Sequence, residues 1–162
     1  MKNAAKIAFL MFIAISAIGF PGNAAGAPAR DAGVTFKDAE GKDWILLELK
    51  RDEIIIPIDR QKLAAYDMGG VYTIYFQEGR LNGLGAPNRY QAPYSTGGNR
   101  SLSIGNIAST LMFSFIEPDG LKEREYFDYL SGANRWDLWE GKLELYCSGS
   151  KGDKVVLVYT QK

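Results

Sequence analysis

Residues Arg135–Thr160, RWDLWEGKLELYCSGSKGDKVVLVYT, decide the fold class of this chain. Three short segments rich in aliphatic and aromatic residues are separated by two glycine-containing turns, which predicts an antiparallel meander. In the middle segment, Leu143, Leu145 and Cys147 occupy every second position and therefore share one face of the expected strand. This alternation predicts that Cys147 is a small buried side chain rather than a nucleophile.

The chain upstream of this meander continues the same pattern from residue 36 onward. Further β-rich segments are expected at Trp44–Lys50, Glu53–Ile58, Val71–Gln77, Arg80–Leu84, Asn88–Ser95 and Arg100–Ile104. Asp59 is placed to cap a short helix over residues 61–66, and residues 121–130 predict a longer helix, with Asp119 as its cap and Gly132 as its end. We therefore expect one α+β domain that is mostly β, an antiparallel curved sheet or small barrel-like meander with one packed α-helix.

The first 29 residues have the composition of a secretory signal peptide. Lys2 and Lys6 precede an apolar run over Ile7–Phe20, and a stretch of small residues follows. The apolar run has 14 residues, whereas a helix needs about 20 to cross a bilayer, so cleavage is expected rather than a permanent anchor. We expect the cut between residues 24 and 29, where no cysteine is available to carry a lipid. The mature domain, residues 30–162, is then predicted to be periplasmic or secreted, without a stable membrane anchor.

The composition excludes several classes of function. The chain has 19 basic and 19 acidic residues, so it lacks the positive field that nucleic-acid binding requires. It has no histidine and a single cysteine, which removes histidine-based nucleophile pairs, histidine-ligated zinc, multi-cysteine metal sites and internal disulfides. We predict no catalytic residue, no metal and no cofactor.

Two weaker patterns have structural interpretations. Gly83 and Gly85 superficially match a dinucleotide-binding loop, but Pro87 lies near the position of the third glycine and the following residues predict a strand, so the glycines are interpreted as permitting sharp backbone geometry. Paired carboxylates could catalyse hydrolysis, but the acids Glu123, Glu125 and Asp128 on the expected helix are interpreted as a solvated helix face.

Residues 44–159 contain a series of segments found together in one family. A tryptophan-led strand at Trp44 is followed by Gly83–Tyr90 (GLGAPNRY), then by residues 108–114 (ASTLMFS), a helix around residues 125–130 and a strand at 143–145. In this order and spacing the chain resembles the META domain, also called the HslJ-like domain. The resemblance implies a compact barrel-like sheet with one packed helix. It also implies an exported envelope protein linked to stress, without an established catalytic activity.

The chain departs from the family pattern at both of its cysteines. The family's glycine–cysteine pair is Ala86-Pro87 in this chain, and the cysteine of its second motif is Ser114, so no redox or covalent role is carried over. The motif positions that remain are candidates for binding or for local structure, together with the neighbouring tyrosines. These candidate positions are Asn88, Arg89, Tyr90, Tyr94, Ser109 and Thr110.

Three hypotheses of function follow from this sequence. The first is a non-enzymatic periplasmic protein that supports the envelope by binding an envelope protein or a small apolar or aromatic ligand, which an exposed cluster of Arg89, Tyr90 and Tyr94 would favour. The second is a carrier that holds an apolar molecule in a cavity inside the curved sheet, because phenylalanine, tyrosine and isoleucine are abundant. The third is a carboxylate-dependent hydrolase, which requires ionisable groups that converge in a cleft.

Overall fold

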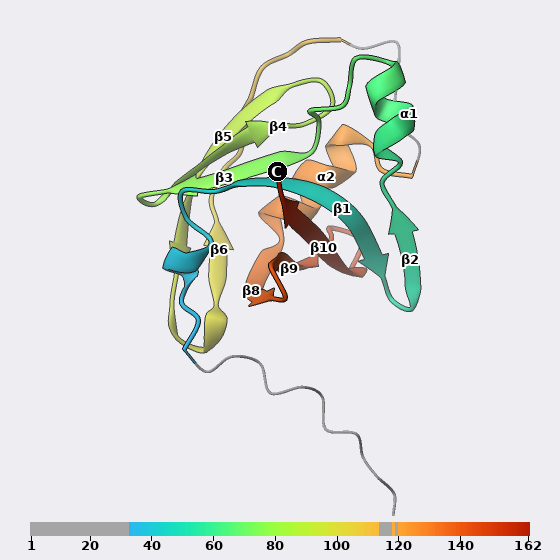
Figure 1. Cartoon of the computed structure of the whole chain (residues 1–162). Helices are drawn as coiled ribbons and strands as arrows, with labels where there is room; N and C mark the ends of the chain where they lie inside the picture. Colours follow the sequence, from blue (N-terminus) through green and yellow to red (C-terminus); the bar gives the residue numbers. More distant parts are fainter. Residues whose placement is uncertain (1–32, 114–117, 119) are drawn as a thin grey trace, which may run out of the picture.

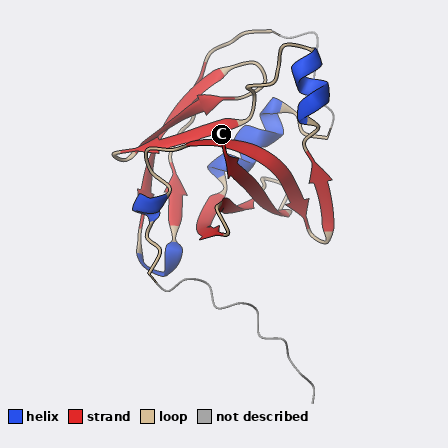
Figure 2. Cartoon of the chain, viewed as in Figure 1, coloured by secondary structure: helices blue, strands red, loops and turns tan. Residues whose placement is uncertain are grey.

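The computed structural model describes residues 33–113, 118 and 120–162 (Figure 1). The strands are β1 (Asp43–Arg51), β2 (Ile54–Pro57), β3 (Thr73–Gln77), β4 (Arg80–Leu84), β5 (Arg89–Thr96), β6 (Leu102–Ile104), β7 (Ala108–Ser109), β8 (Ala133–Trp139), β9 (Lys142–Ser148) and β10 (Lys154–Gln161). The helices are α1 (Arg60–Ala65) and α2 (Glu123–Ser131), with short 3-10 turns at Phe36–Asp38 and Gly98–Arg100. Strands dominate the described part of the chain, as Figure 2 shows.

All strands belong to one antiparallel sheet that curves until its ends meet. The order is β6-β5-β4-β3-β1-β10-β9-β8, with β2 added beside β1 and β7 beside β5. A register shift between Leu46 and Glu48 marks a bulge in β1, which allows this strand to bend, and the bend is visible in Figure 1. Ser101, next to β6, bridges Arg135 of β8 and brings the two ends of the sheet together. The predicted α+β class and the barrel-like antiparallel sheet are confirmed.

The inner face of this sheet forms the hydrophobic core. Phe36 packs into this core, with the centre of its ring 5.0 Å from that of Phe76 and 5.2 Å from that of Trp136. Cys147 is buried on the same face of β9 as Leu143 and Leu145, as the alternation predicts. Other large side chains that are fully buried include Trp44, Leu46, Leu49, Tyr72, Ile74, Leu81, Leu121, Tyr126, Leu130, Leu157 and Tyr159.

The two helices differ in how they contact the sheet. In α1 the predicted cap is confirmed, since the Asp59 carboxylate accepts a hydrogen bond from the Lys62 backbone N–H at 2.9 Å. The packed helix, α2, begins at Glu123, two residues later than predicted, because Lys122 has extended backbone angles and precedes the first turn. The predicted cap Asp119 lies outside the described residues, whereas Gly132 ends the helix as expected. No helix in the described ranges has the length and apolarity needed to cross a membrane.

Candidate functional site

The first residue of α2 binds the turn that leads into β5. The Glu123 carboxylate oxygen Oε1 accepts hydrogen bonds from the backbone N–H of Ala86 at 2.6 Å and of Asn88 at 2.7 Å. Its second oxygen, Oε2, accepts a bond from the Asn88 side-chain Nδ2 at 2.7 Å. A carboxylate at a helix N-terminus is also favoured by the helix dipole. We call this arrangement the Asn88–Glu123 clasp; it fixes the turn that contains the cis Ala86–Pro87 peptide.

The side chain of Asn88 also holds the segment that follows β7. Its Oδ1 accepts hydrogen bonds from the Met112 backbone N–H at 2.6 Å and from the Thr110 hydroxyl at 2.8 Å. Its Nδ2 donates a second bond, to the Met112 carbonyl, at 3.1 Å. With these bonds and the one to Glu123, both donors and both lone pairs of the amide are satisfied. The side chains of Asn88 and Thr110 are therefore interpreted as holding local structure. Asn88 is also only 5% exposed.

Directly beside this fixed backbone lie three exposed apolar side chains. Leu111 is 98% exposed, Met112 61% and Phe113 81%. Exposed apolar residues are common singly, but three consecutive ones form a local patch that water solvates poorly. We refer to Leu111–Phe113 as the apolar tripeptide. Sequence reasoning identified the flanking Thr110 and missed these three residues, although a run of Leu, Met and Phe outside any expected strand was a visible signal.

The two candidate tyrosines point into the barrel, so the exposed cluster that would favour the first hypothesis is not formed by them. Tyr90 is 3% exposed and Tyr94 8%, whereas Arg89 on the same strand is exposed. The Tyr90 hydroxyl donates to the Thr73 carbonyl at 2.8 Å, and that of Tyr94 donates to Glu40. Strand alternation places residues 90, 92 and 94 on one face and residue 89 on the other. Tyr90 and Tyr94 therefore do not form a binding surface together with Arg89.

The other candidates lie together on the outer face of the sheet. Arg89, Ser109 and Thr110 line an open hollow of about 390 Å³ over β4, β5 and β7. Three further residues that line it were not singled out from the sequence: Asn82, Gln91 and Ala108. We call this feature the polar hollow. It brings together four of the six candidates, because the buried Tyr90 also lines it, while Asn88 belongs to the clasp and Tyr94 lies in the core.

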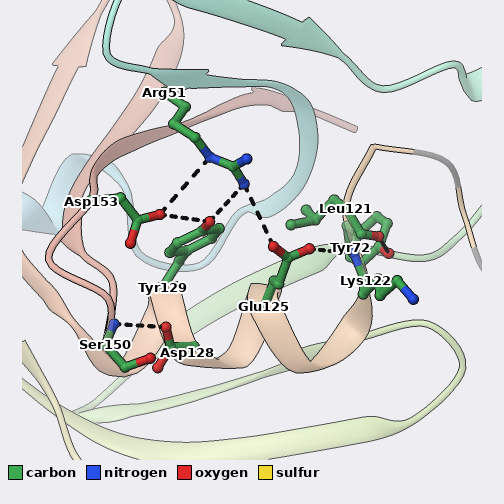
Figure 3. Close-up of polar contacts among 9 residues, drawn as sticks. All are labelled: Arg51, Tyr72, Leu121, Lys122, Glu125, Asp128, Tyr129, Ser150 and Asp153. Carbon is green, nitrogen blue, oxygen red and sulfur yellow. Dashed lines mark hydrogen bonds and ion pairs between the residues drawn. The ribbon is translucent and has the colours of Figure 1, made fainter.

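A second polar cluster ties α2 to two hairpins (Figure 3). Arg51, at the end of β1, donates from Nη2 to the Tyr129 hydroxyl at 2.7 Å, and that hydroxyl donates to Asp153 at 2.9 Å. The same guanidinium lies 3.7 Å from Glu125 on α2. Farther along the helix, Asp128 accepts a bond from the Ser150 backbone N–H at 2.8 Å. These contacts join elements distant in sequence, so this cluster is interpreted as a structural tie.

The reactive groups of the core are held in unreactive states. Burial raises the pKa of the Cys147 thiol well above its usual range, so little thiolate is present at neutral pH. Burial raises the pKa of Tyr126 to about 12, and burial and the neighbouring Tyr126 raise that of Tyr90 as well. Among residues 33–113, 118 and 120–162, no three Asp, Glu or Cys side chains form a group that could hold a metal ion.

The interior of the described barrel is filled with side chains. The ring of Tyr126, reaching inward from α2, lies 5.0 Å from that of Tyr72 and 5.9 Å from that of Tyr90. Its hydroxyl lies 3.0 Å from the Tyr90 hydroxyl and accepts from the Tyr159 hydroxyl at 3.2 Å. These contacts occupy the space that an apolar cargo would need, which argues against the carrier hypothesis.

The META domain family matches residues 57–162, which is more than half of the chain, and the chain belongs to this family. The NMR structure of a protein from Burkholderia xenovorans is similar, with a TM-score of 0.62 and 19% identity over 89% of this chain and 97% of that one. A crystal structure of a DUF4847 family protein from Bacteroides vulgatus has a TM-score of 0.52 and 14% identity over 77% of this chain and 95% of that one. At these identities the likeness shows the fold alone. No curated protein matches the chain.

Proposed function

We propose that this chain is an exported, non-catalytic META-domain protein that binds an envelope protein through the apolar tripeptide Leu111–Phe113. The observation that carries the proposal is the exposure of these side chains on a backbone that Asn88 holds at both the N–H and the carbonyl of Met112. A surface that is already ordered loses little conformational entropy when a partner covers it.

The chemistry of the partner surface follows from the same residues. Leucine, methionine and phenylalanine side chains bind best in an apolar groove that removes them from water. The chain as a whole has equal numbers of acidic and basic residues, so long-range electrostatic steering contributes little to the encounter. The partner is therefore expected to present an apolar groove, and the complex to tolerate high salt.

A non-catalytic role is supported by how the polar groups of the site are used. The Glu123 carboxylate accepts three hydrogen bonds from the turn before β5 and is thereby committed to structure. The thiol of Cys147 and the phenol of Tyr126 are buried and protonated at neutral pH. None of these groups is placed as a general base or nucleophile for a bound substrate.

The proposal is tested by photo-crosslinking in exporting cells, with the crosslinking residue at position 111. The captured partner is then purified and its affinity measured against wild type and Leu111→Ser/Phe113→Ser. A matched control is Ile54→Ser/Ile55→Ser, which removes two other exposed apolar side chains, on β2. We expect at least about a tenfold loss of affinity for the first variant and none for the control. Equal losses of affinity in the two variants, or the absence of any adduct from position 111, would overturn the proposal.

Export is tested on the same material by the mass of the protein recovered from the periplasm. A mass that corresponds to cleavage between residues 24 and 29 supports the predicted signal peptide. An uncut chain in the membrane fraction contradicts the proposed location while leaving the binding experiment to decide the role of the tripeptide.

A further inference from the structure

The polar hollow is formed by three neighbouring strands in a defined register. Asn82 of β4 lies directly opposite Gln91 of β5, and Gln91 lies opposite Ala108 of β7. Asn82 and Gln91 are exposed, and Arg89 points to the same outer face as Gln91, two positions along β5. The short side chain of Ala108 leaves space beside the longer ones, and a depression results.

Four of the polar side chains that line the hollow are free to bind a ligand, whereas those of Tyr90 and Thr110 are hydrogen-bonded within the protein. Within the described residues, those of Asn82, Arg89, Gln91 and Ser109 make no hydrogen bond or ion pair with the protein. This contrasts with the clasp immediately below, where every polar atom of the Asn88 amide has a partner. The sheet therefore presents four unused hydrogen-bonding side chains around one depression of a size that small-molecule ligands fill.

The identity of these groups defines the chemistry of the ligand. Arg89 is the one charged side chain among the described residues that line the hollow, and no acid among them neutralises it. A guanidinium pairs with a carboxylate through two parallel hydrogen bonds. The amides of Asn82 and Gln91 each offer donors and an acceptor, and the Ser109 hydroxyl offers both, which suits a ligand that carries hydroxyl or acetamido groups.

We propose that the polar hollow binds a saccharide that carries one carboxylate, with Arg89 pairing the carboxylate and the side chains of Asn82, Gln91 and Ser109 binding its hydroxyl or acetamido groups. A sugar ring places several hydrogen-bonding groups in a small volume, and a hollow in which several hydrogen-bonding side chains surround the apolar surface of Tyr90 and Ala108 matches it better than a peptide side chain. This site uses none of the side chains of the apolar tripeptide, so the inference does not rest on the proposed function.

The experiment compares two probes that differ by the carboxylate. N-acetylmuramic acid is N-acetylglucosamine with a lactyl ether that ends in a carboxylate. Each is titrated into the exported protein while amide chemical shifts are recorded by NMR. We expect saturable shifts at Asn82, Arg89, Gln91 and Ser109 with N-acetylmuramic acid, and binding at least about tenfold weaker with N-acetylglucosamine.

Two variants on the same face of the sheet distinguish a specific role of Arg89 in binding the carboxylate from a nonspecific effect of removing one positive charge. Arg89→Met removes the proposed carboxylate partner, and Arg80→Met removes an exposed arginine two positions from Asn82 on β4 that lies outside the hollow. We expect a loss of at least about tenfold for Arg89→Met and no change for Arg80→Met. The same NMR spectra show that both variants are folded.

Four results would overturn this inference. The first is equal binding of the two sugars, and the second is an equal loss in the two arginine variants. The third is binding of the dipeptide alanylalanine as tight as that of N-acetylmuramic acid, which would show that a carboxylate is recognised without the sugar. Shifts that map to residues outside β4, β5 and β7 would also contradict the site.

Discussion

Asn88 and Glu123 are 35 residues apart in sequence and are joined by two hydrogen bonds of 2.7 Å each, one from the Asn88 backbone N–H and one from its side-chain Nδ2. A single carboxylate thereby orients both the turn before β5 and the amide that holds Met112. Hydrogen bonds therefore connect the start of α2, the turn before β5 and the backbone of the apolar tripeptide into one rigid unit.

Replacement of Glu123 by glutamine tests this unit. Glutamine keeps one carbonyl oxygen but turns an N–H₂ group toward N–H donors of Ala86 or Asn88, so at least one buried donor loses its acceptor. We expect Glu123→Gln to lower the free energy of unfolding by roughly 1–3 kcal/mol, measured by urea denaturation. Glu53→Gln, on the exposed β1–β2 turn, is the matched control, expected within about 0.5 kcal/mol of wild type. Equal midpoints for Glu123→Gln and wild type would show that the clasp contributes nothing.

The sequence predicts the strands better than it predicts the clasp. Strand positions follow from local alternation and glycine-containing turns, and the predicted segments agree with β1 to β6 and β8 to β10 to within two residues, whereas the two-residue strand β7 was not predicted. Glu123 was interpreted as a solvated helix charge because its partners lie on a distant turn that no local pattern connects to it. For Tyr90 and Tyr94 the local pattern is more informative than for Glu123. Their alternation with Arg89 along the strand indicates that they lie on the face opposite to Arg89. Only the curvature of the sheet decides that this face is the interior.

Gly83 is another residue that the sequence analysis singles out but whose structural role differs from the predicted one. From the sequence, this glycine is interpreted as permitting sharp backbone geometry. In the structure it lies inside β4, where the absence of a side chain allows the Tyr90 ring to pack against the strand. A Cβ at this position would lie 2.0 Å from the Thr73 carbonyl oxygen and 2.8 Å from the Tyr90 ring. The requirement is therefore a close approach of chain segments, which depends on strand register.

Gly83→Ala is expected to be strongly destabilising for this reason. The new methyl group meets backbone that cannot move without breaking the β3–β4 ladder, so we expect a loss of about 2–4 kcal/mol in the free energy of unfolding. Gly98→Ala is the matched control, because a Cβ there meets no atom within 4 Å. The measurement is the thermal and urea midpoint of each variant. A Gly83→Ala protein as stable as Gly98→Ala would contradict the close approach of Tyr90 to β4.

The closure of the barrel depends on the ion pair between Arg100 and Asp137. Asp137 of β8 is 1% exposed, and Arg100 reaches it from the turn before β6, with its guanidinium also 5.4 Å from the Trp136 ring. Removal of one member of a buried pair leaves the other charge uncompensated, so Arg100→Met is expected to cost roughly 3 kcal/mol.

A double-mutant cycle with Asp137→Asn checks this explanation. Because the asparagine no longer carries the buried charge, Arg100→Met should cost much less in that background, with a coupling energy of about 1–3 kcal/mol. Strict additivity of the two substitutions would show that the ion pair does not hold the two ends of the sheet together.

Alkaline pH is expected to destabilise the protein through its buried tyrosines. Burial raises the pKa of Tyr126 from 10.0 to about 12, and burial together with the hydrogen bond to Asp153 raises that of Tyr129 to about 12. Both pKa values are higher in the folded state than in the unfolded state, so folding favours the protonated phenols. Their contribution is complete below pH 10 and is lost as the pH rises from 10 to about 12.

The measurement is the free energy of unfolding in urea as a function of pH, with phenolate absorbance recorded in parallel. Tyr126→Phe removes one phenol that must stay protonated in the folded state, so the slope of stability against pH above 10 should become shallower even if the variant is less stable at neutral pH. Tyr66→Phe is the control, since that ring is half exposed on the surface beside α1. If Tyr126→Phe left the slope unchanged, the buried hydroxyl cluster would not be the source of alkaline unfolding.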